Sequence, residues 1–504
     1  MRLRMDHDNK RMTPVTPEPM STGTAGIDHI LCGGLPGERL YLVEGTPGTG
    51  KTTLALRFLL QGAESGERSL YITLSETARE LEAVAQSHGW SLDGIALFEL
   101  VAEDEFGSDH EQTLLHPSEV ELGETVRGII AQVEAVNPHR VVLDSLSELR
   151  LLSQNSLRYR RQILALKHFF AKRSCTVMML DDRSSQASDL QLHSIAHGVI
   201  SLEQAASDFG AERRRLRIVK MRGLKFRGGY HDFTIEKGGL EVYPRLIAAE
   251  HTRAFDGRPV STGLAELDAL LGGGLVPGTN TLLTGPAGAG KTSMAVRCIV
   301  AALERGEKAA LYLFDERLAT LKIRSATLGT PLEPYIDSGQ LILRQVDPAE
   351  LSPGEFAGAV QRAVEDDGVT MVVIDSLNGY LQAMPSDNYL TLQLHEVLSY
   401  LSLQGVVSMM ILGLHGVTGD LRADIDLSYL ADAVMMLRYF EADGAVHKSI
   451  AVIKTRTSEH ERTIREFAIE KSGIRIGEPI TAFDGVLSGQ PRYLVKGGEL
   501  LKDA

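Results

Sequence analysis

The sequence contains the same phosphate-binding motif twice, and this repeat constrains the fold more than any other feature. GTPGTGKT runs from Gly45 to Thr52, and GPAGAGKT runs from Gly285 to Thr292. Both satisfy GxxxxGK[ST], in which glycines let the backbone curl so that successive N–H groups point at phosphate oxygens. Each copy follows an apolar run and opens a helical pattern, which adds the dipole of a helix N-terminus. The sequence therefore predicts two sites for the polyphosphate of ATP or GTP.

The repeat extends well beyond the two loops. With a shift of 240 residues, STGTAGIDHILCGGL from Ser21 falls on STGLAELDALLGGGL from Ser261. Short runs rich in Val, Ile and Leu alternate with longer helical patterns in both halves, which predicts an α/β fold with a mostly parallel sheet and right-handed crossovers. Shorter strands with turn signals close each half and predict an antiparallel extension of that sheet. We therefore expect two tandem P-loop NTPase domains, each built on such a sheet.

Changes in patterning set the expected boundaries. The first domain is predicted over residues 16–247 and the second over 261–486. Between them, 248–260 is polar and unpatterned and is predicted to be a linker. Residues 1–15 are predicted to be a disordered tail, and 487–504 a loosely specified tail.

Composition limits the classes of protein that fit. The net charge is −14, and the one concentration of positive charge starts at Glu212, so a nucleic-acid partner is not expected. The three cysteines, Cys32, Cys175 and Cys298, have no CxxC spacing and fit a reducing compartment. The apolar runs are too short to span a bilayer, and no secretory signal opens the chain. These observations predict a cytoplasmic protein without a membrane contact.

Two lysines and two threonines carry the phosphate chemistry. Lys51 and Lys291 are expected to reach the β- and γ-phosphates, and Thr52 and Thr292 to coordinate Mg²⁺. The nucleotide-binding residues predicted in the loops are Gly45, Thr46, Pro47, Gly48, Thr49, Gly50, Lys51, Thr52, Thr53, Gly285, Pro286, Ala287, Gly288, Ala289, Gly290, Lys291, Thr292 and Ser293.

A second metal anchor follows an apolar strand in each half. Asp144 ends RVVLD and Asp375 ends MVVID, and each is followed by Ser and Leu. This is the Walker B arrangement, whose carboxylate holds Mg²⁺ or its water. An aspartate that merely caps a strand end is the alternative interpretation. ATP and Mg²⁺ are the cofactors that these residues predict.

Hydrolysis also needs a base that orients water toward the γ-phosphate. Glu76 and Glu316 end the strand after the phosphate-loop helix at equivalent positions, and Asp315 adjoins the second, where the first half has Ser75. Two adjacent carboxylates near a polyphosphate hold a proton more readily than one alone, which suits a base. We therefore predict Glu76, Glu316 and Asp315 as catalytic residues. A surface residue at a helix start is the alternative for either glutamate.

Together these motifs resemble the KaiC family, the RecA-like ATPases of bacterial circadian clocks and their relatives. The resemblance runs from STGTAGIDHILCGGLP to FDGVLSGQP and rests on the segment before each loop, GxxGxGKT, the strand-end acids, hhhDSL, and KMRG or KxR. It implies two RecA-like domains whose subunits form a homo-oligomer, a double-layered hexameric ring with ATP at the subunit interfaces.

The resemblance also implies residues that act on a neighbour. Lys220 with Arg222, and Lys454 with Arg456, match the positions that reach the neighbouring subunit's nucleotide. A positive charge supplied in trans stabilises transition-state charge like an arginine finger. A salt bridge on a strand face is the alternative interpretation of each pair.

Further positions both match and depart from the family. His460 matches a family position, whereas Phe226 stands where the first domain usually has histidine. The second domain of the clock protein phosphorylates itself on an adjacent Ser–Thr pair, which aligns with Ser428 and Tyr429. Ser428 keeps the acceptor hydroxyl, while the oxygen of Tyr429 lies further from the backbone than that of threonine. A serine without chemistry is the alternative for Ser428.

The predicted function is that of an ATPase and Ser/Thr autokinase with a signalling or timing output. The sequence lacks the long tail that clock proteins offer to KaiA, which argues against that partner, whereas a KaiB-like partner fits the first domain. Two rivals remain: a RecA- or DnaB-like DNA motor, and an ATP-binding scaffold with negligible turnover. Ser75, in place of an acid, favours slow hydrolysis in the first domain.

Overall fold

The computed structural model describes ten segments: 19–100, 117–153, 155–183, 189–206, 210–381, 387–416, 427–442, 444–471, 473–488 and 492–493. The chain divides into two compact units, Met1–Asp208 with Glu212–Arg245, and Phe209–Ala211 with Leu246–Ala504. The predicted tail at 1–15 and most of the one at 487–504 lie outside the described residues.

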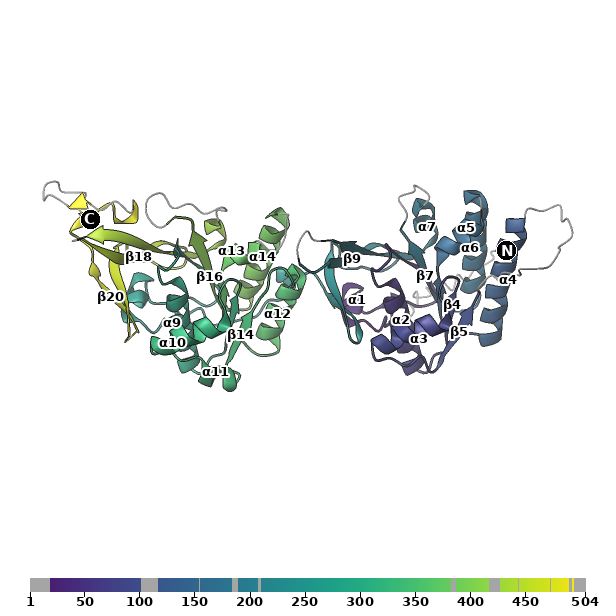
Figure 1. Cartoon of the computed structure of the whole chain (residues 1–504), viewed down its shortest axis with the longest axis horizontal. Coiled ribbons are helices and arrows are strands. Elements are labelled where there is room, and N and C mark those ends of the chain that lie inside the picture. Colours follow the sequence, from purple (N-terminus) through teal and green to yellow (C-terminus); the bar gives the residue numbers. More distant parts are fainter. Residues whose placement is uncertain are drawn as a thin grey trace, which may run out of the picture. The chain divides into compact units, whose positions relative to one another are not determined.

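The first unit is built on a nine-stranded sheet formed by its described residues (Figure 1). From one edge to the other, the strands are β11 (Gly239–Tyr243), β10 (His231–Glu236), β9 (Arg213–Met221), β8 (Gly198–Ala205), β3 (Leu40–Gly45), β7 (Thr176–Asp182), β6 (Arg140–Asp144), β4 (Ser69–Thr73) and β5 (Ile95–Glu99). The strands from β8 to β5 pair in parallel, whereas β9, β10 and β11 pair antiparallel. The predicted sheet and its antiparallel extension are confirmed.

Helices cover both faces of this sheet (Figure 1). On β6, Val142 packs into the core on the side of α2, and Val141 and Leu143 pack into the core on the side of α4 and α6. This alternation within a fully buried strand is what a parallel sheet with helices on both faces requires. The helices of the unit are α1 (Ala25–Ile30), α2 (Lys51–Glu64), α3 (Ala78–Ser87), α4 (Pro117–Val136), α5 (Leu146–Leu152), α6 (Ser156–Ala171) and α7 (Asp189–Ile195), and the short strands β1 (Pro19–Met20) and β2 (Leu35–Pro36) pair separately.

The second unit repeats this architecture. Its strands, in sheet order, are β14 (Leu341–Gln345), β13 (Ala309–Leu313), β15 (Met371–Asp375), β16 (Val407–Leu414), β12 (Asn280–Pro286), β17 (Ala433–Ala442), β18 (Ala445–Thr455), β19 (Arg465–Glu470) and β20 (Gly473–Pro479). Its helices are α8 (Ala265–Leu270), α9 (Lys291–Glu304), α10 (Leu318–Thr327), α11 (Glu333–Asp337), α12 (Pro353–Glu365), α13 (Leu377–Leu381) and α14 (Asp387–Leu403). Short 3₁₀ turns are η1 (Ala248–Glu250), η2 (Ser428–Leu430) and η3 (Val486–Ser488), and β21 (Phe483–Asp484) pairs with β22 (Arg492–Tyr493). The predicted tandem α/β fold is therefore present in both halves.

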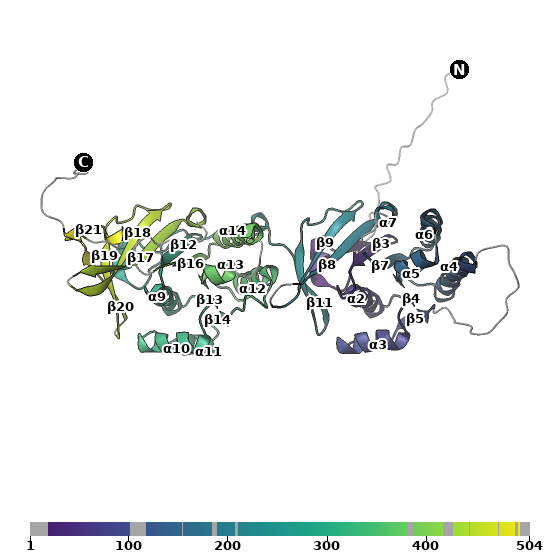
Figure 2. The ribbon, with the colours of Figure 1, turned by 45° about the horizontal axis from the view of Figure 1, so that its top comes forward.

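Two features differ between the units or from expectation. Figure 2 shows α10 and α11 at the same edge of the second unit, and both lie between β13 and β14 in the chain. Among the described residues the first unit has α3 alone between β4 and β5, because residues 92–94 stand in place of 332–339. Residues 248–260, predicted to be a linker, pack on the second unit: Ala248 is buried and Arg253 N donates to Leu403 O at 3.0 Å. No helix among the described residues is both long and apolar enough to cross a membrane.

Candidate nucleotide-binding sites

Each phosphate loop joins a buried strand to a helix whose first turn has no side-chain cap within the described part of the chain. Gly50 and Gly290 precede α2 and α9 with left-handed backbones, φ 90° and 108°, which side chains disfavour. A Cβ at Gly50 would also lie 2.8 Å from Ile235 Cδ1. No side chain of the described residues caps either helix, so backbone N–H groups stay available for an anion. This is the geometry that the two motifs predict.

The loop lysines fold back over their own loops. Lys51 Nζ donates to Gly45 O at 2.9 Å and to Thr46 O at 3.1 Å. Lys291 Nζ does the same with Gly285 O and Pro286 O, both at 2.8 Å. Burial lowers the pKa of Lys291, while the charge of Asp375 opposes that shift. Each ammonium is thus held at the mouth of its loop, where a phosphate would arrive.

The predicted metal anchors lie together in both units. Thr292 Oγ1 donates to Asp375 Oδ2 at 2.7 Å, and Thr52 Oγ1 to Asp144 Oδ2 at 3.5 Å. Burial raises the pKa of Asp144, and it raises the pKa of Asp375 to about 6, with the charge of Glu316 adding to the second shift. A hydroxyl and a carboxylate side by side fit Mg²⁺, which usually takes one or two protein oxygens together with phosphates and waters.

Tyr71 is a member of the first site that sequence reasoning missed. Its hydroxyl donates to Asp144 Oδ2 at 2.5 Å from inside β4. Burial, followed by the charge of Asp144, raises the pKa of Tyr71 well above its usual range, so the phenol stays protonated as a donor. Leu311 stands at the matching place in β13. A tyrosine at the middle of a buried strand next to a Walker B strand was the available signal.

Glu76 is held in place through its backbone, and one of its carboxylate oxygens has no partner. Its N–H donates to Thr73 Oγ1 at 2.9 Å, and Thr77 begins α3 with a capping box to Glu80. Glu76 Oε2 is buried and has no hydrogen-bond partner among the described residues. Burial, with the charge of Asp144 next, raises the pKa of Glu76. An orphan carboxylate oxygen with raised proton affinity is suited to accept a proton from water.

The corresponding carboxylates of the second unit are bonded to donors. Arg324, two turns along α10, donates to both Glu316 oxygens at 2.8 Å. Asp315 accepts a hydrogen bond from the Ser376 hydroxyl. Such a bidentate pair occupies the oxygens that a water molecule would use. Arg324 is another residue that sequence reasoning missed, since the matching residue of α3 is Val84.

Comparison with known proteins identifies the fold family. The family described as "ATPase: KaiC" matches this chain twice, over residues 20–247 and 260–480. The chain belongs to the KaiC ATPase family. Both phosphate loops fall within the matched ranges, so the family supports nucleotide binding and an ATP-hydrolysing fold.

Individual relatives match over nearly their whole length. The circadian clock oscillator protein KaiC of a Picosynechococcus strain is 27% identical over 482 residues, covering 92% of this chain and 91% of the relative. The circadian clock protein KaiC3 of a Synechocystis strain is 27% identical, covering 94% and 95%. The KaiC of Synechococcus elongatus is also 27% identical, covering 94% and 91%.

The basic pairs that the KaiC family suggests lie away from the phosphate loop of their own unit. Lys220 Nζ donates to the carbonyls of His193 and Ala196, and Arg222 to that of Ser194. These carbonyls precede β8, whose first residue, Gly198, pairs with Tyr41 rather than with Gly45. The loop, in contrast, follows the carboxyl end of β3. The pair therefore lies toward the opposite end of the sheet.

The second unit repeats this placement and adds the predicted acceptors. Lys454 Nζ donates to Ser428 O at 3.1 Å and to Ala431 O at 2.9 Å, and Arg456 to Tyr429 O at 3.0 Å. Ser428 opens η2 immediately before β17, and the side chain of Tyr429 is 55% exposed. The two basic residues thus hold the backbone of the segment that carries the acceptors.

The two remaining positions from the resemblance have local partners. His460 Nδ1 lies 3.1 Å from Thr455 Oγ1, next to Arg456. Phe226 packs against the core of the first unit. Neither contact involves a phosphate loop of the same unit.

The basic strand β9 is partly neutralised. Arg215 contacts Glu203 at 3.0 Å and lies over the ring of Tyr230, and Arg214 contacts Glu212 at 3.1 Å. Carboxylates that pair with arginines on a strand face neutralise part of the positive charge that would attract nucleic-acid phosphates. The absence of a nucleic-acid partner remains a prediction.

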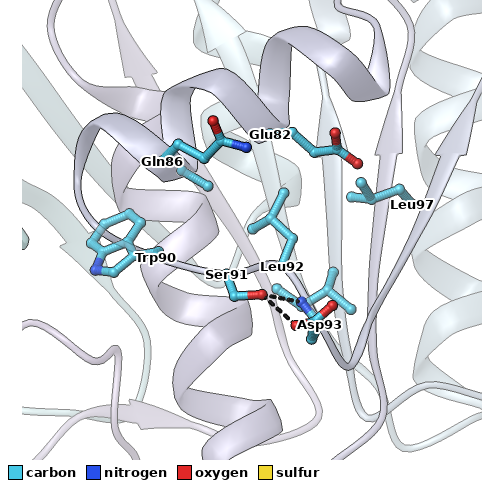
Figure 3. Close-up of a pocket in the computed structure, with 9 residues that line it drawn as sticks. Glu82, Gln86, Trp90, Ser91, Leu92, Asp93 and Leu97 are labelled. Carbon is cyan, nitrogen blue, oxygen red and sulfur yellow. Dashed lines mark hydrogen bonds between the residues drawn. The ribbon is translucent and has the colours of Figure 1, made fainter.

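A hollow of about 420 Å³ lies apart from the loops, between α3 and β5 (Figure 3). Leu92 and Leu97 are among the apolar residues that line it, and Glu82 and Asp93 are among the acidic ones. None of the predicted site residues lines it.

Proposed function

We propose that this chain binds Mg-ATP at both loops, hydrolyses it chiefly in the first unit and phosphorylates Ser428 from the second. One observation carries the division: the two sites share the lysine, threonine and aspartate, but Glu76 has an unbonded oxygen whereas Glu316 is held by Arg324. A free base serves water activation, and a restrained one disfavours it.

The residues that would hold Mg²⁺ are Thr52 with Asp144 and Thr292 with Asp375. The ion would neutralise phosphate charge in the ground and transition states. Lys51 and Lys291 would bind the β- and γ-phosphates, and the loop N–H groups would bind the remaining oxygens. At the first site, Glu76 would orient a water molecule and take its proton.

At the second site, the Ser428 hydroxyl would attack the γ-phosphorus. The bond from that phosphorus to the bridging oxygen breaks and ADP leaves. Glu316 takes the hydroxyl proton after one of its oxygens is released from Arg324. The acceptor and the loop belong to different subunits in this proposal. Ala433 pairs with Thr281, four residues before Gly285, so the strand that follows Ser428 begins roughly 13 Å along the strand direction from the loop of its own unit.

The same reasoning supports a homo-oligomeric ring, which we propose to be a hexamer. Lys220, Arg222, Lys454 and Arg456 lie toward the sheet end opposite the loop of their own unit, so they would reach a nucleotide only across a subunit boundary. His460, beside Arg456, would join them. The relatives named as circadian clock proteins suggest a signalling or timing role with a KaiB-like partner for the first unit; KaiA is not part of this proposal.

Phosphosite mapping together with native mass measurement tests the proposal. The full chain is incubated with Mg-ATP; we expect a ring mass, and phosphate on Ser428 that is absent from Lys291→Ala. Ser428→Ala should keep the ring and phosphate release while losing the modification. A chain that stays monomeric with Mg-ATP, or a Ser428 that stays unmodified while ATP is consumed, would contradict the ring or the autokinase respectively.

A further inference from the structure

The lysine of the first phosphate loop already has three acceptors. Besides the carbonyls of Gly45 and Thr46, Lys51 Nζ contacts Asp182 Oδ1 at 2.8 Å. An ammonium has three N–H donors, so all of them are used. Asp182 ends β7, where it pairs in register with Gly45. Any phosphate that is to bind Lys51 must therefore take over a donor from one of these three groups.

The second loop has no such carboxylate. The residue that pairs with Gly285 on the neighbouring strand is Gly413, at the place of Asp182. Among the described residues, Lys291 Nζ donates to two carbonyls, which leaves one N–H for an incoming phosphate. The two loops have the same motif, but the lysine of the second has an N–H group available for the nucleotide, whereas all three N–H groups of the first are bonded.

Asp182 also touches the segment after the Walker B strand. Its Oδ2 accepts from Ser147 Oγ at 3.3 Å, and Ser147 Oγ lies 2.5 Å from Ser145 Oγ, next to Asp144. The Asp182 charge contributes to the raised pKa of both Glu76 and Asp144. A polyphosphate entering this site would thus meet a third carboxylate close to the two that its chemistry uses.

We infer that Asp182 competes with the nucleotide for Lys51 and weakens nucleotide binding at the first loop relative to the second. The inference rests on the proposed nucleotide binding at that loop. A polyphosphate must displace the carboxylate from the ammonium and then tolerate its like charge. Asp182 is 44% exposed and can turn to solvent, so it sets affinity without blocking the site. A first site of lower affinity responds to changes in ATP level that leave the second site saturated.

The test replaces Asp182 and Gly413, each by the residue of the other unit, in the full chain. Binding of Mg-ADP is measured by calorimetry, with Lys291→Ala removing the second site, for the parent and for Asp182→Asn and Asp182→Gly. We expect both variants to bind Mg-ADP about threefold to tenfold more tightly than the parent. This range corresponds to the loss of a partly exposed ion pair together with the loss of repulsion between the Asp182 carboxylate and the phosphates. In a Lys51→Ala background, Gly413→Asp should weaken the second site by a similar factor. Both effects should shrink in high salt, because the competing interaction is ionic.

Each outcome has a separate meaning. Unchanged affinity in Asp182→Asn and Asp182→Gly overturns the competition, and tenfold weaker binding makes Asp182 part of the binding site instead. If Asp182→Gly is poorly folded in a thermal melt without nucleotide, the isosteric Asp182→Asn decides. No Mg-ADP binding by the Lys291→Ala parent would refute nucleotide binding at the first loop rather than the role of Asp182.

Discussion

The two phosphate-loop sites keep the same lysine, threonine and aspartate but surround their glutamates differently. In the first, Thr73 and the capping box at Thr77 fix the backbone around Glu76 and leave one carboxylate oxygen unbonded. In the second, Arg317 occupies the cap position without a side-chain bond, and Arg324 takes both oxygens of Glu316. A single difference on the following helix, valine or arginine, decides whether the glutamate oxygens are occupied. Identical motifs can thus support sites of unequal reactivity.

Removing each glutamate gives the largest expected contrast. We expect Glu76→Gln, assayed with Lys291→Ala, to lower phosphate release about 10²-fold, because a positioned base contributes about 10²–10⁴. Glu316→Gln, assayed with Lys51→Ala, should lower hydrolysis only a few-fold but abolish phosphate on Ser428. Phosphate release and phosphosite mapping measure the two effects.

Equal losses in the two glutamine variants would break the comparison. Unchanged turnover in both would remove the base assignment from each glutamate and favour a scaffold that binds ATP without using it. Thermal melts of the variants exclude a loss that comes from unfolding.

The fold and the motif residues were predictable because they depend on local patterns. The strands RVVLD and MVVID are short, mostly apolar and end in an acid, and they appear as β6 and β15. Partners that lie far apart in sequence were not predictable. Lys51 meets Asp182 only because β7 pairs with β3, and the hydroxyl of Tyr71 reaches Asp144 only because β4 pairs with β6.

Tertiary contacts also decided the segment between the domains. Polar composition between 248 and 260 predicted a linker, yet His251 pairs with Glu365 at 2.9 Å and Phe255 contacts the region of Gly278. The residue pattern within the segment could not predict these contacts, because each partner lies more than twenty residues away in the sequence. The assignments of Ser428 and of the residues that act in trans remain predictions.

Lowering the pH should reduce the free energy of unfolding of the first unit more than that of the second. His231 is fully buried, accepts from Arg245 N at 2.8 Å through Nδ1 and donates from Nε2 to Arg227 O at 3.1 Å, and burial lowers its pKa to about 4. In the unfolded chain this histidine takes up a proton near pH 6.5, whereas in the folded chain it stays neutral down to about pH 4. Its contribution to the free energy of unfolding is therefore complete above pH 6.5 and is lost as the pH drops toward 4. Between pH 7 and pH 5 this removes about 2 kcal/mol from the first unit.

The second unit has Arg465 at that position, paired with Glu461 at 2.8 Å. Arginine stays charged throughout, and the Thr463 hydroxyl and Arg465 lower the pKa of Glu461, so this pair is unaffected in the same window. Hydrogen exchange read by peptide at pH 7 and pH 5, corrected for intrinsic rates, should show the loss in the first unit alone. His231→Gln should reduce that dependence without abolishing it, because burial also lowers the pKa of His197 in the same unit to about 4. An equal loss in both units would assign the effect elsewhere.

The smallest expected effect tests what Arg324 does to Glu316. Replacing Arg324 with the valine of the first unit frees both carboxylate oxygens, so we expect hydrolysis at the second site, read with Lys51→Ala, to rise about fivefold, a change equivalent to about 1 kcal/mol for a partly exposed pair. The reciprocal Val84→Arg should lower first-site hydrolysis by a similar factor, read with Lys291→Ala. If Arg324→Val instead lowers second-site turnover, Arg324 orients Glu316 for catalysis, and the two sites differ in how the base is held rather than in whether it is free.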